Sequence, residues 1–276
     1  MAPESVALWC ALPLAAAVVL DSLELIAERR HLRDDGLFAL PVLVTGRPRT
    51  LMRGPQAAPL RALFGYPTVL ALPALQIVAA AVLAAAVAIR TPALEVAAGL
   101  GAIVIIVARG LLYLRNQFGL DGSNHMILAA STAIAVVLLV PDQGAQQIAL
   151  YYLAGQLLLG YAASGIAKAF SPEWRSGSAI PEITSTISYG TPAVGAVLMR
   201  NRAVGLLLCW SVIAFECSAP LLLLAGTPGA VAIIAGGLAF HTGVAAIMGL
   251  NTFFWSFASA YPALLYLASQ VDRLWQ

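Results

Sequence analysis

This sequence has few charged residues. Asp, Glu, Lys and Arg make up 10% of its 276 residues, while hydrophobic residues make up 61%. The mean hydropathy is +0.87, and these values lie outside the range of soluble globular proteins. The composition therefore excludes a soluble enzyme and predicts an all-α integral membrane protein. A net charge of +2 is too small to indicate a nucleic-acid partner.

Cysteine is also scarce. Cys10, Cys209 and Cys217 lie in apolar segments without paired spacing, so we expect them to pack between helices and predict no disulfide. The first apolar segment has no positive residue before it and no small-residue cleavage site after it, which favours a membrane helix over a signal peptide. Low-complexity linkers and internal repeats are lacking too. We therefore predict a single transmembrane domain over 1–276.

Eight apolar segments are long enough to cross a hydrocarbon core, which needs about 20 residues of helix. They cover 6–26, 66–89, 93–114, 125–140, 147–167, 203–224, 229–250 and 252–268. The intervening segment 178–199 is less apolar and is broken by Pro181, Gly190, Pro192 and Gly195. The pattern predicts a polytopic bundle of about eight transmembrane helices in the cell membrane, surrounded by lipid. Segment 178–199 is expected to be broken or re-entrant and to form a wall of a cavity.

Arginine is concentrated in the first long loop, 28–61, which contains Arg29, Arg30, Arg33, Arg47, Arg49, Arg53 and Arg61. The positive-inside rule places this loop in the cytoplasm and the N-terminus outside. Counting segments from there places the turn after Lys168 on the same side. Asp21, Glu24 and Glu28 precede the loop on one helical face, and we expect them to pair with its arginines.

The fifth apolar segment ends at Lys168, the only lysine among 15 basic residues. Two interpretations remain open. Desolvation disfavours the charged amine, so a lysine at the edge of hydrocarbon can act as a base, which an arginine cannot. Alternatively, Lys168 extends to the headgroups as an anchoring cation. The same segment carries Gly155, Gly160, Ser164 and Gly165, small residues that predict close helix packing.

Three further ionisable residues lie in or beside apolar segments. His125 opens the fourth segment, where Asp121 or Ser123 could cap the helix, while Glu216 and His241 lie well inside theirs. An amine, two imidazoles and a carboxylate from four helices suit proton abstraction and return. Two histidines and a glutamate could instead bind a metal ion. We predict no metal site, because these residues lack short helical spacing and Lys168 would repel a dication.

Several short motifs, taken together, resemble the HTTM family, the membrane domain related to vitamin K-dependent gamma-carboxylase. In chain order they are Asp35-Gly36-Leu37-Phe38, Ser123-Asn124-His125, Tyr152-Leu153-Ala154-Gly155, Gly165-Ile166-Ala167-Lys168 with Trp174 and Gly177 behind it, and Phe240-His241 followed by Asn251, Phe254 and Tyr261-Pro262. They span nearly the whole chain in the family's order. Two details differ from the carboxylase: Lys168 stands alone instead of beside a second lysine, and Trp174 is one residue further away.

The resemblance implies that Lys168 deprotonates a vitamin K-like hydroquinone, with O2 consumed in epoxidation and CO2 added to a peptide glutamate. It implies helper roles for His125 and His241, and a quinone site including Trp174, Asn124 and Asn251, to which we add Glu216. Carboxylation is the less secure part, because the chain has no counterpart of the large domain with which the carboxylase recognises its substrates. The alternatives are a non-enzymatic partner or maturation factor for a secreted peptide and, third, a transporter.

Overall fold

The structure, a computed structural model, describes residues 1–43, 57–116 and 121–275. Within these ranges the chain forms helices and turns and no strand, as the composition predicts. Arg47, Arg49 and Arg53 of the arginine-rich loop lie outside the described residues.

Six helices in the described ranges are long and apolar enough to cross a membrane. They are α1 (Pro3–Ala27), α4 (Ala71–Ile89) with a preceding 3₁₀ turn (Thr68–Leu70), α5 (Pro92–Arg115), α6 (Gly122–Leu139), α11 (Arg202–Leu222) with a following 3₁₀ turn (Leu223–Ala225), and α12 (Thr227–Met248). The chain is therefore a multi-pass membrane protein. These helices match six of the eight predicted segments.

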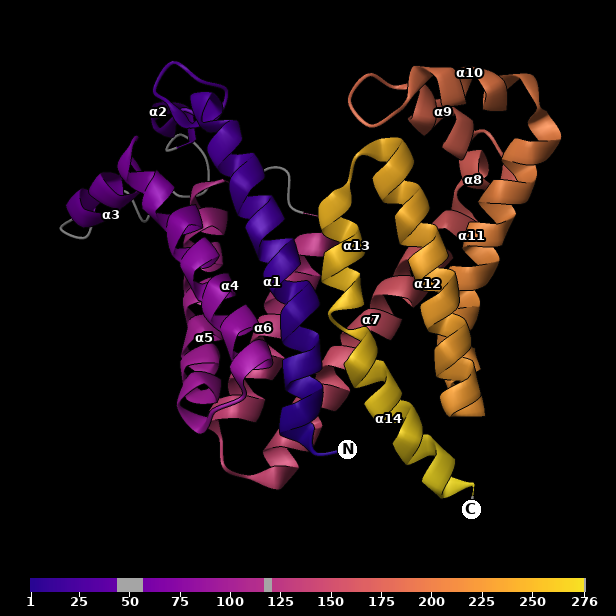
Figure 1. Cartoon of the computed structure of the whole chain (residues 1–276). Coiled ribbons are helices and arrows are strands. Elements are labelled where there is room, and N and C mark those ends of the chain that lie inside the picture. The colour runs from indigo at the N-terminus through magenta and orange to yellow at the C-terminus, as the bar shows by residue number, and fades with distance from the viewer. Residues whose placement is uncertain (44–56, 117–120, 276) are drawn as a thin grey trace.

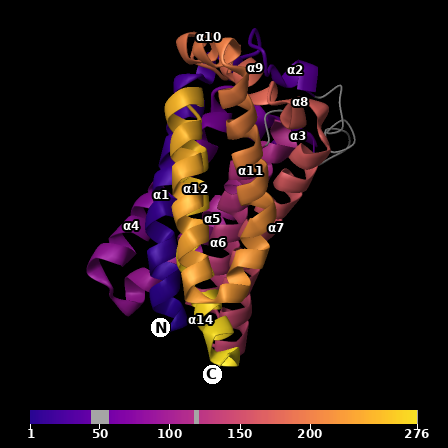
Figure 2. The same cartoon turned by 90° about the vertical axis from the view of Figure 1, so that its right-hand side faces the viewer.

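The other two predicted segments run along the same bundle (Figures 1 and 2). The 147–167 segment lies within α7 (Gln143–Phe170), the longest helix, which carries more polar residues than the six above. The 252–268 segment was expected to form one helix. It forms two, α13 (Asn251–Ala258) and α14 (Tyr261–Leu274). Pro262 stands in the first turn of α14, where a proline is tolerated because its missing N–H has no helical partner.

Short helices gather at the end of the bundle opposite both termini (Figures 1 and 2). They are η1 (Arg29–Leu32), α2 (Leu40–Leu43), α3 (Ala57–Phe64), α8 (Pro172–Ser176), α9 (Ala179–Ser185) and α10 (Pro192–Arg200). The described part of the arginine-rich loop thus lies at the same end as the turn after Lys168. Segment 178–199 forms α9 and α10, and α8, α9 and α10 all pack on α11.

The helix ends are stabilised by side chains that the sequence places next to them. Asp121 accepts hydrogen bonds from the backbone N–H groups of Ser123 and Asn124 at 3.0 and 3.2 Å, which confirms its predicted role as the cap of α6. Gln146 Nε2 donates to the carbonyl oxygens of Val137 and Val140, both at 3.1 Å, and so ties the end of α6 to α7.

The acidic face of α1 pairs differently from the sequence prediction. Glu28 does contact loop residues, with its carboxylate 3.2 Å from Arg30 and 3.1 Å from His31. Asp21 instead accepts a 2.7 Å hydrogen bond from Arg109 of α5, whose second terminal nitrogen donates to Asn124 at 2.7 Å. Arg109 is only 2% exposed. It has these partners because an arginine buried among membrane helices needs a carboxylate within reach.

Candidate functional site

A cavity of about 1010 Å³ lies between α6, α7, α11, α12 and α13, and α8, α9 and α10 contribute residues to its wall. Most of the wall is aliphatic and aromatic. The polar and ionisable side chains in its wall include His125, Tyr161, Lys168, Trp174, Glu216 and His241. An apolar cavity of this size with a few convergent polar groups is typical of a small-molecule site.

Lys168 and Glu216 form an ion pair in the cavity wall. The Lys168 Nζ donates to both carboxylate oxygens, at 3.0 Å to Oε1 and 2.7 Å to Oε2. The side chains are 18% and 3% exposed, respectively. Glu216 lies in the middle third of the span Arg202–Ala225. The amine is therefore held at a carboxylate of a neighbouring apolar helix.

Close packing of α7 on α11 brings the two charges together. A Cβ at Gly165 would lie 2.8 Å from the backbone nitrogen of Cys217 and 2.9 Å from the Glu216 Cβ, so only glycine fits. Gly155 and Gly160 have no such neighbour within 4 Å, and Gly160 lines the cavity. The predicted packing role therefore holds for Gly165 and is wrong for Gly155 and Gly160.

The short helix α8 places an aromatic ring beside the amine. The Ser171 hydroxyl accepts a 3.4 Å hydrogen bond from the Trp174 backbone N–H at the start of α8, and Gly177 ends the helix with φ +83°. The Trp174 ring centroid lies 5.1 Å from Lys168 Nζ, within the range of a cation–π contact. Trp174 thus contacts the proposed base instead of only anchoring the helix at the membrane surface.

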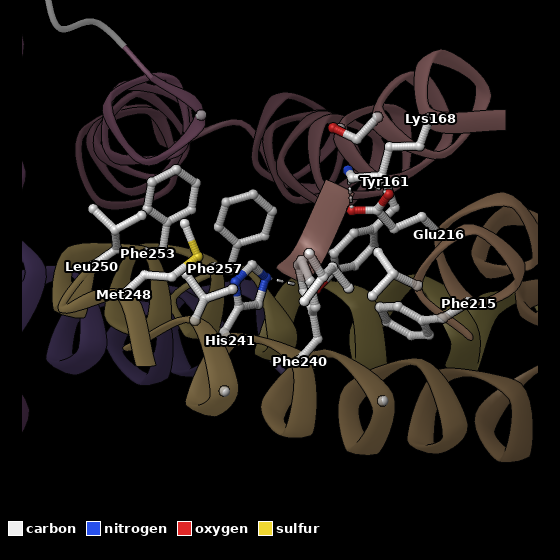
Figure 3. Close-up of a pocket in the computed structure, with 18 of the residues that line it drawn as sticks. Tyr161, Lys168, Phe215, Glu216, Phe240, His241, Met248, Leu250, Phe253 and Phe257 are labelled. Carbon is white, nitrogen blue, oxygen red and sulfur yellow. Dashed lines mark hydrogen bonds and ion pairs between the residues drawn. The ribbon is translucent and has the colours of Figure 1, made fainter. Parts of the chain in front are cut away.

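His241 occupies a second place along the cavity, on α12 (Figure 3). It is 2% exposed, and its Nε2 lies 3.3 Å from the Tyr161 hydroxyl. The ring lies between Phe257 and Phe240, with centroid distances of 4.3 and 4.9 Å. Its Nδ1 is buried and has no hydrogen-bond partner among the described residues. A buried polar atom without a partner is costly, and in a cavity wall it points to a ligand or water.

The remaining candidate residues divide into two groups. His125 is exposed and lines the cavity, together with Lys168 and His241. Asn124 and Asn251 do not line it. Asn124 accepts from Arg109 and donates to Asp121 at 3.0 Å, on another side of α6. Asn251 is exposed at the start of α13.

Sequence reasoning missed two tyrosines of this site. Tyr161 is 1% exposed, and its hydroxyl lies 3.3 Å from that of Tyr261 as well as from His241. Tyr161 precedes Lys168 by seven residues in α7, two helical turns, so both lie on one face. That spacing could have identified Tyr161 from the sequence. No such spacing identifies the contact of Tyr261, because it depends on how α13 and α14 meet.

The arrangement supports proton chemistry more readily than metal chemistry. No group of three His, Cys, Asp or Glu side chains in the described ranges could hold a metal ion. Instead, the Lys168 amine and the Glu216 carboxylate lie together at one place. The His241 imidazole, with one nitrogen that has no hydrogen-bond partner among the described residues, lies at another. Both border a largely apolar space.

Comparison with protein-family models, with curated proteins and with solved structures finds no significant match to this chain.

Proposed function

We propose that the protein is a membrane enzyme that binds a vitamin K-like hydroquinone in the cavity and removes a hydroxyl proton with Lys168. One observation carries the proposal: the only lysine lies in the wall of a 1010 Å³ apolar cavity, paired with a carboxylate within the membrane span. A pair that only joined two helices would not need a ligand-sized space beside it. This interpretation rests on the family resemblance for the identity of the hydroquinone.

The cavity residues fit such a molecule. Phe215, Phe240, Phe253 and Phe257 offer ring faces to a flat aromatic group, and the aliphatic wall suits an apolar tail. The Lys168 and His241 side chains line the same cavity, and the Nδ1 of His241 is buried without a hydrogen-bond partner among the described residues. When bound, a hydroquinone supplies an acidic hydroxyl and two reducing electrons. By the resemblance, these would serve O2-dependent epoxidation and, with CO2, modification of a peptide.

Glu216 makes Lys168 usable as a base. An ion pair and the corresponding neutral amine and carboxylic acid differ little in energy when desolvated, because burial penalises separated charges. When the Lys168 proton moves to a Glu216 oxygen, the lone pair left on Nζ faces that oxygen, and rotation of the amine about its Cε–Nζ bond turns the lone pair toward the cavity. That amine then takes a hydroxyl proton, while Glu216 holds the first one. Trp174 stabilises the ammonium form through its ring face.

We propose eight crossings of the cell membrane around this site, with α7 and the consecutive helices α13 and α14 as the two beyond the six apolar spans. The 28 residues of α7 are about 42 Å long at 1.5 Å per residue, enough to cross at a tilt. Contacts of α9 and α10 with α11 favour a re-entrant course for the segment 178–199. The whole chain would then act as one membrane domain.

The test is turnover of phylloquinone hydroquinone, with quinone and epoxide measured by chromatography. Wild-type protein should consume the hydroquinone, and Lys168→Arg and Lys168→Ala should not, since a guanidinium keeps its proton. A small amine in solution should partly restore Lys168→Ala but not Lys168→Arg. Arg175→Lys, in exposed α8, serves as the control. Activity retained in Lys168→Arg would make Lys168 an anchoring cation and would contradict its role as the base, whereas no turnover by the wild-type protein would favour the non-enzymatic alternative.

A further inference from the structure

The cavity is open on part of its surface, and two of its exposed lining residues are Ser211 of α11 and Ala239 of α12. These two helices contact each other near the turn at Gly226 that joins them, where a Cβ at Gly236 would collide with the Phe215 ring. Ser211 and Ala239 lie about one helical turn beyond this contact, each on its own helix. Figure 1 shows that α11 and α12 diverge from there toward the other end of the bundle. We call the space between them the α11–α12 gap.

The short helices close the gap at its far end. A Cβ at Gly205 of α11 would lie 2.6 Å from the Gly177 carbonyl oxygen, so the backbone that leads into α9 lies directly on α11. On the other side, the Thr191 hydroxyl at the start of α10 donates a 2.8 Å hydrogen bond to the Ile247 carbonyl oxygen of α12. The gap is therefore bounded by α11 and α12 at its sides and by packed contacts at both ends.

The two sides of the gap have nearly the same height. At 1.5 Å per residue, the stretch from Gly205 to Phe215 on α11 is about 15 Å long, and that from Gly236 to Ile247 on α12 is about 17 Å long. Both stretches lie inside the apolar spans Arg202–Ala225 and Thr227–Met248, so the gap faces hydrocarbon. The cavity-lining residues along it include the aliphatic Leu208, Val212, Val244 and Ile247.

We propose that the α11–α12 gap is a lateral opening of the cavity to the bilayer, and that the apolar tail of the bound molecule passes through it while the ring stays beside Lys168. Glu216, the partner of Lys168, directly follows Phe215 at one end of the gap. A ring held at this pair therefore has its tail next to the opening. A membrane-borne molecule can then enter from the lipid without crossing water. The identity of the tail rests on the proposed function, whereas the opening does not.

The cavity also has exposed lining residues on α6 and α7, including His125 and Ser164. Both side chains are polar, and His125 lies in the first turn of α6, near the end of the bundle. Polar side chains near a helix end suit headgroups and water better than an apolar tail. The tail is therefore assigned to the α11–α12 gap.

Photocross-linking in lipid nanodiscs tests the opening without ligand or activity. Gly243 lines the cavity beside the gap, and a Cβ there meets no atom within 4 Å, so a benzophenone side chain has room. We expect adducts with phospholipid acyl chains, detected by mass spectrometry. Adding Ala239→Trp should abolish them. Ala232→Trp is the matched control, because Ala232 is exposed on the same face of α12, seven residues before Ala239, and does not line the cavity. Absent adducts, or equal yields in the two tryptophan variants, overturn the opening.

Binding of phylloquinone and of menadione, which has the same ring without the tail, tests the occupant. Ala239→Trp should lose phylloquinone binding and keep menadione binding, and Ala232→Trp should bind both as wild type does. Loss of both quinones in Ala239→Trp, or of neither, overturns the assignment of the tail. Phylloquinone binding that is lost in Ala163→Trp, at the exposed lining of α7, but kept in Ala239→Trp overturns it as well. Wild-type protein that gives lipid adducts but binds neither quinone supports the opening and contradicts the proposed function instead.

Discussion

The Lys168–Glu216 pair gives the sharpest stability prediction. Glu216 is 3% exposed and Lys168 18%, so removal of one partner leaves the other charge desolvated without compensation. For a buried pair this costs about 3–5 kcal/mol. Glu216→Leu should therefore lower the melting temperature by about 6–20 °C, at about 2–4 °C per kcal/mol for a chain of this size.

The double variant Lys168→Met/Glu216→Leu separates charge from packing. Both replacements are apolar and of similar volume, and such exchanges of buried pairs are often neutral or stabilising. The double variant should therefore melt within a few degrees of wild type but be inactive. Melting in detergent micelles, followed by circular dichroism, measures both variants. If Glu216→Leu melts like wild type, the pair is solvated; if the double variant melts as low as the single one, packing explains the loss. Either result refutes the electrostatic argument.

Three further predictions follow from packing and topology. Gly165→Leu should abolish the folded yield in detergent because α11 leaves no room, whereas Gly160→Leu should fold normally; equal yields would contradict the α7–α11 contact. Single cysteines at Arg33 and Ser176, in a cysteine-free background, should react with an impermeant thiol reagent from the same membrane face; labelling from opposite faces would contradict the topology. Arg109→Leu should lower stability by about 1–3 kcal/mol in chemical unfolding because the Asp21 carboxylate, 27% exposed, loses its partner, and Arg109→Leu/Asp21→Leu should recover most of it.

Hydropathy was sufficient to locate the six apolar spans, because the length and polarity of a span are local properties of the sequence. Hydropathy could not indicate where Lys168 lies in the helix bundle. After α7 ends, α8, α9 and α10 continue along α11, so the end of this helix is not the edge of the bundle.

The sequence also could not predict which side chains pair between helices that are distant in the chain. Asp21 was expected to find a partner in the next loop, but Arg109 lies 88 positions away in the chain and on another helix. Likewise, the sequence does not distinguish a glycine facing a cavity, such as Gly160, from one facing a helix, such as Gly165. Both distinctions depend on tertiary contacts. Tyr161 could have been predicted from the sequence, because its two-turn spacing from Lys168 is a local pattern.

The most direct test of the central claim is whether the cavity holds a quinone. The protein should be purified from native membranes in mild detergent, and its bound lipids identified by mass spectrometry. Gly160→Trp is the matched variant, because Gly160 lines the cavity and a Cβ there meets no atom within 4 Å, so we expect the ring to enter the cavity; an unchanged folded yield is its control. We predict about one quinone per wild-type chain and none in the variant. A wild-type protein free of quinone, or a variant that retains it equally, would contradict the proposed site.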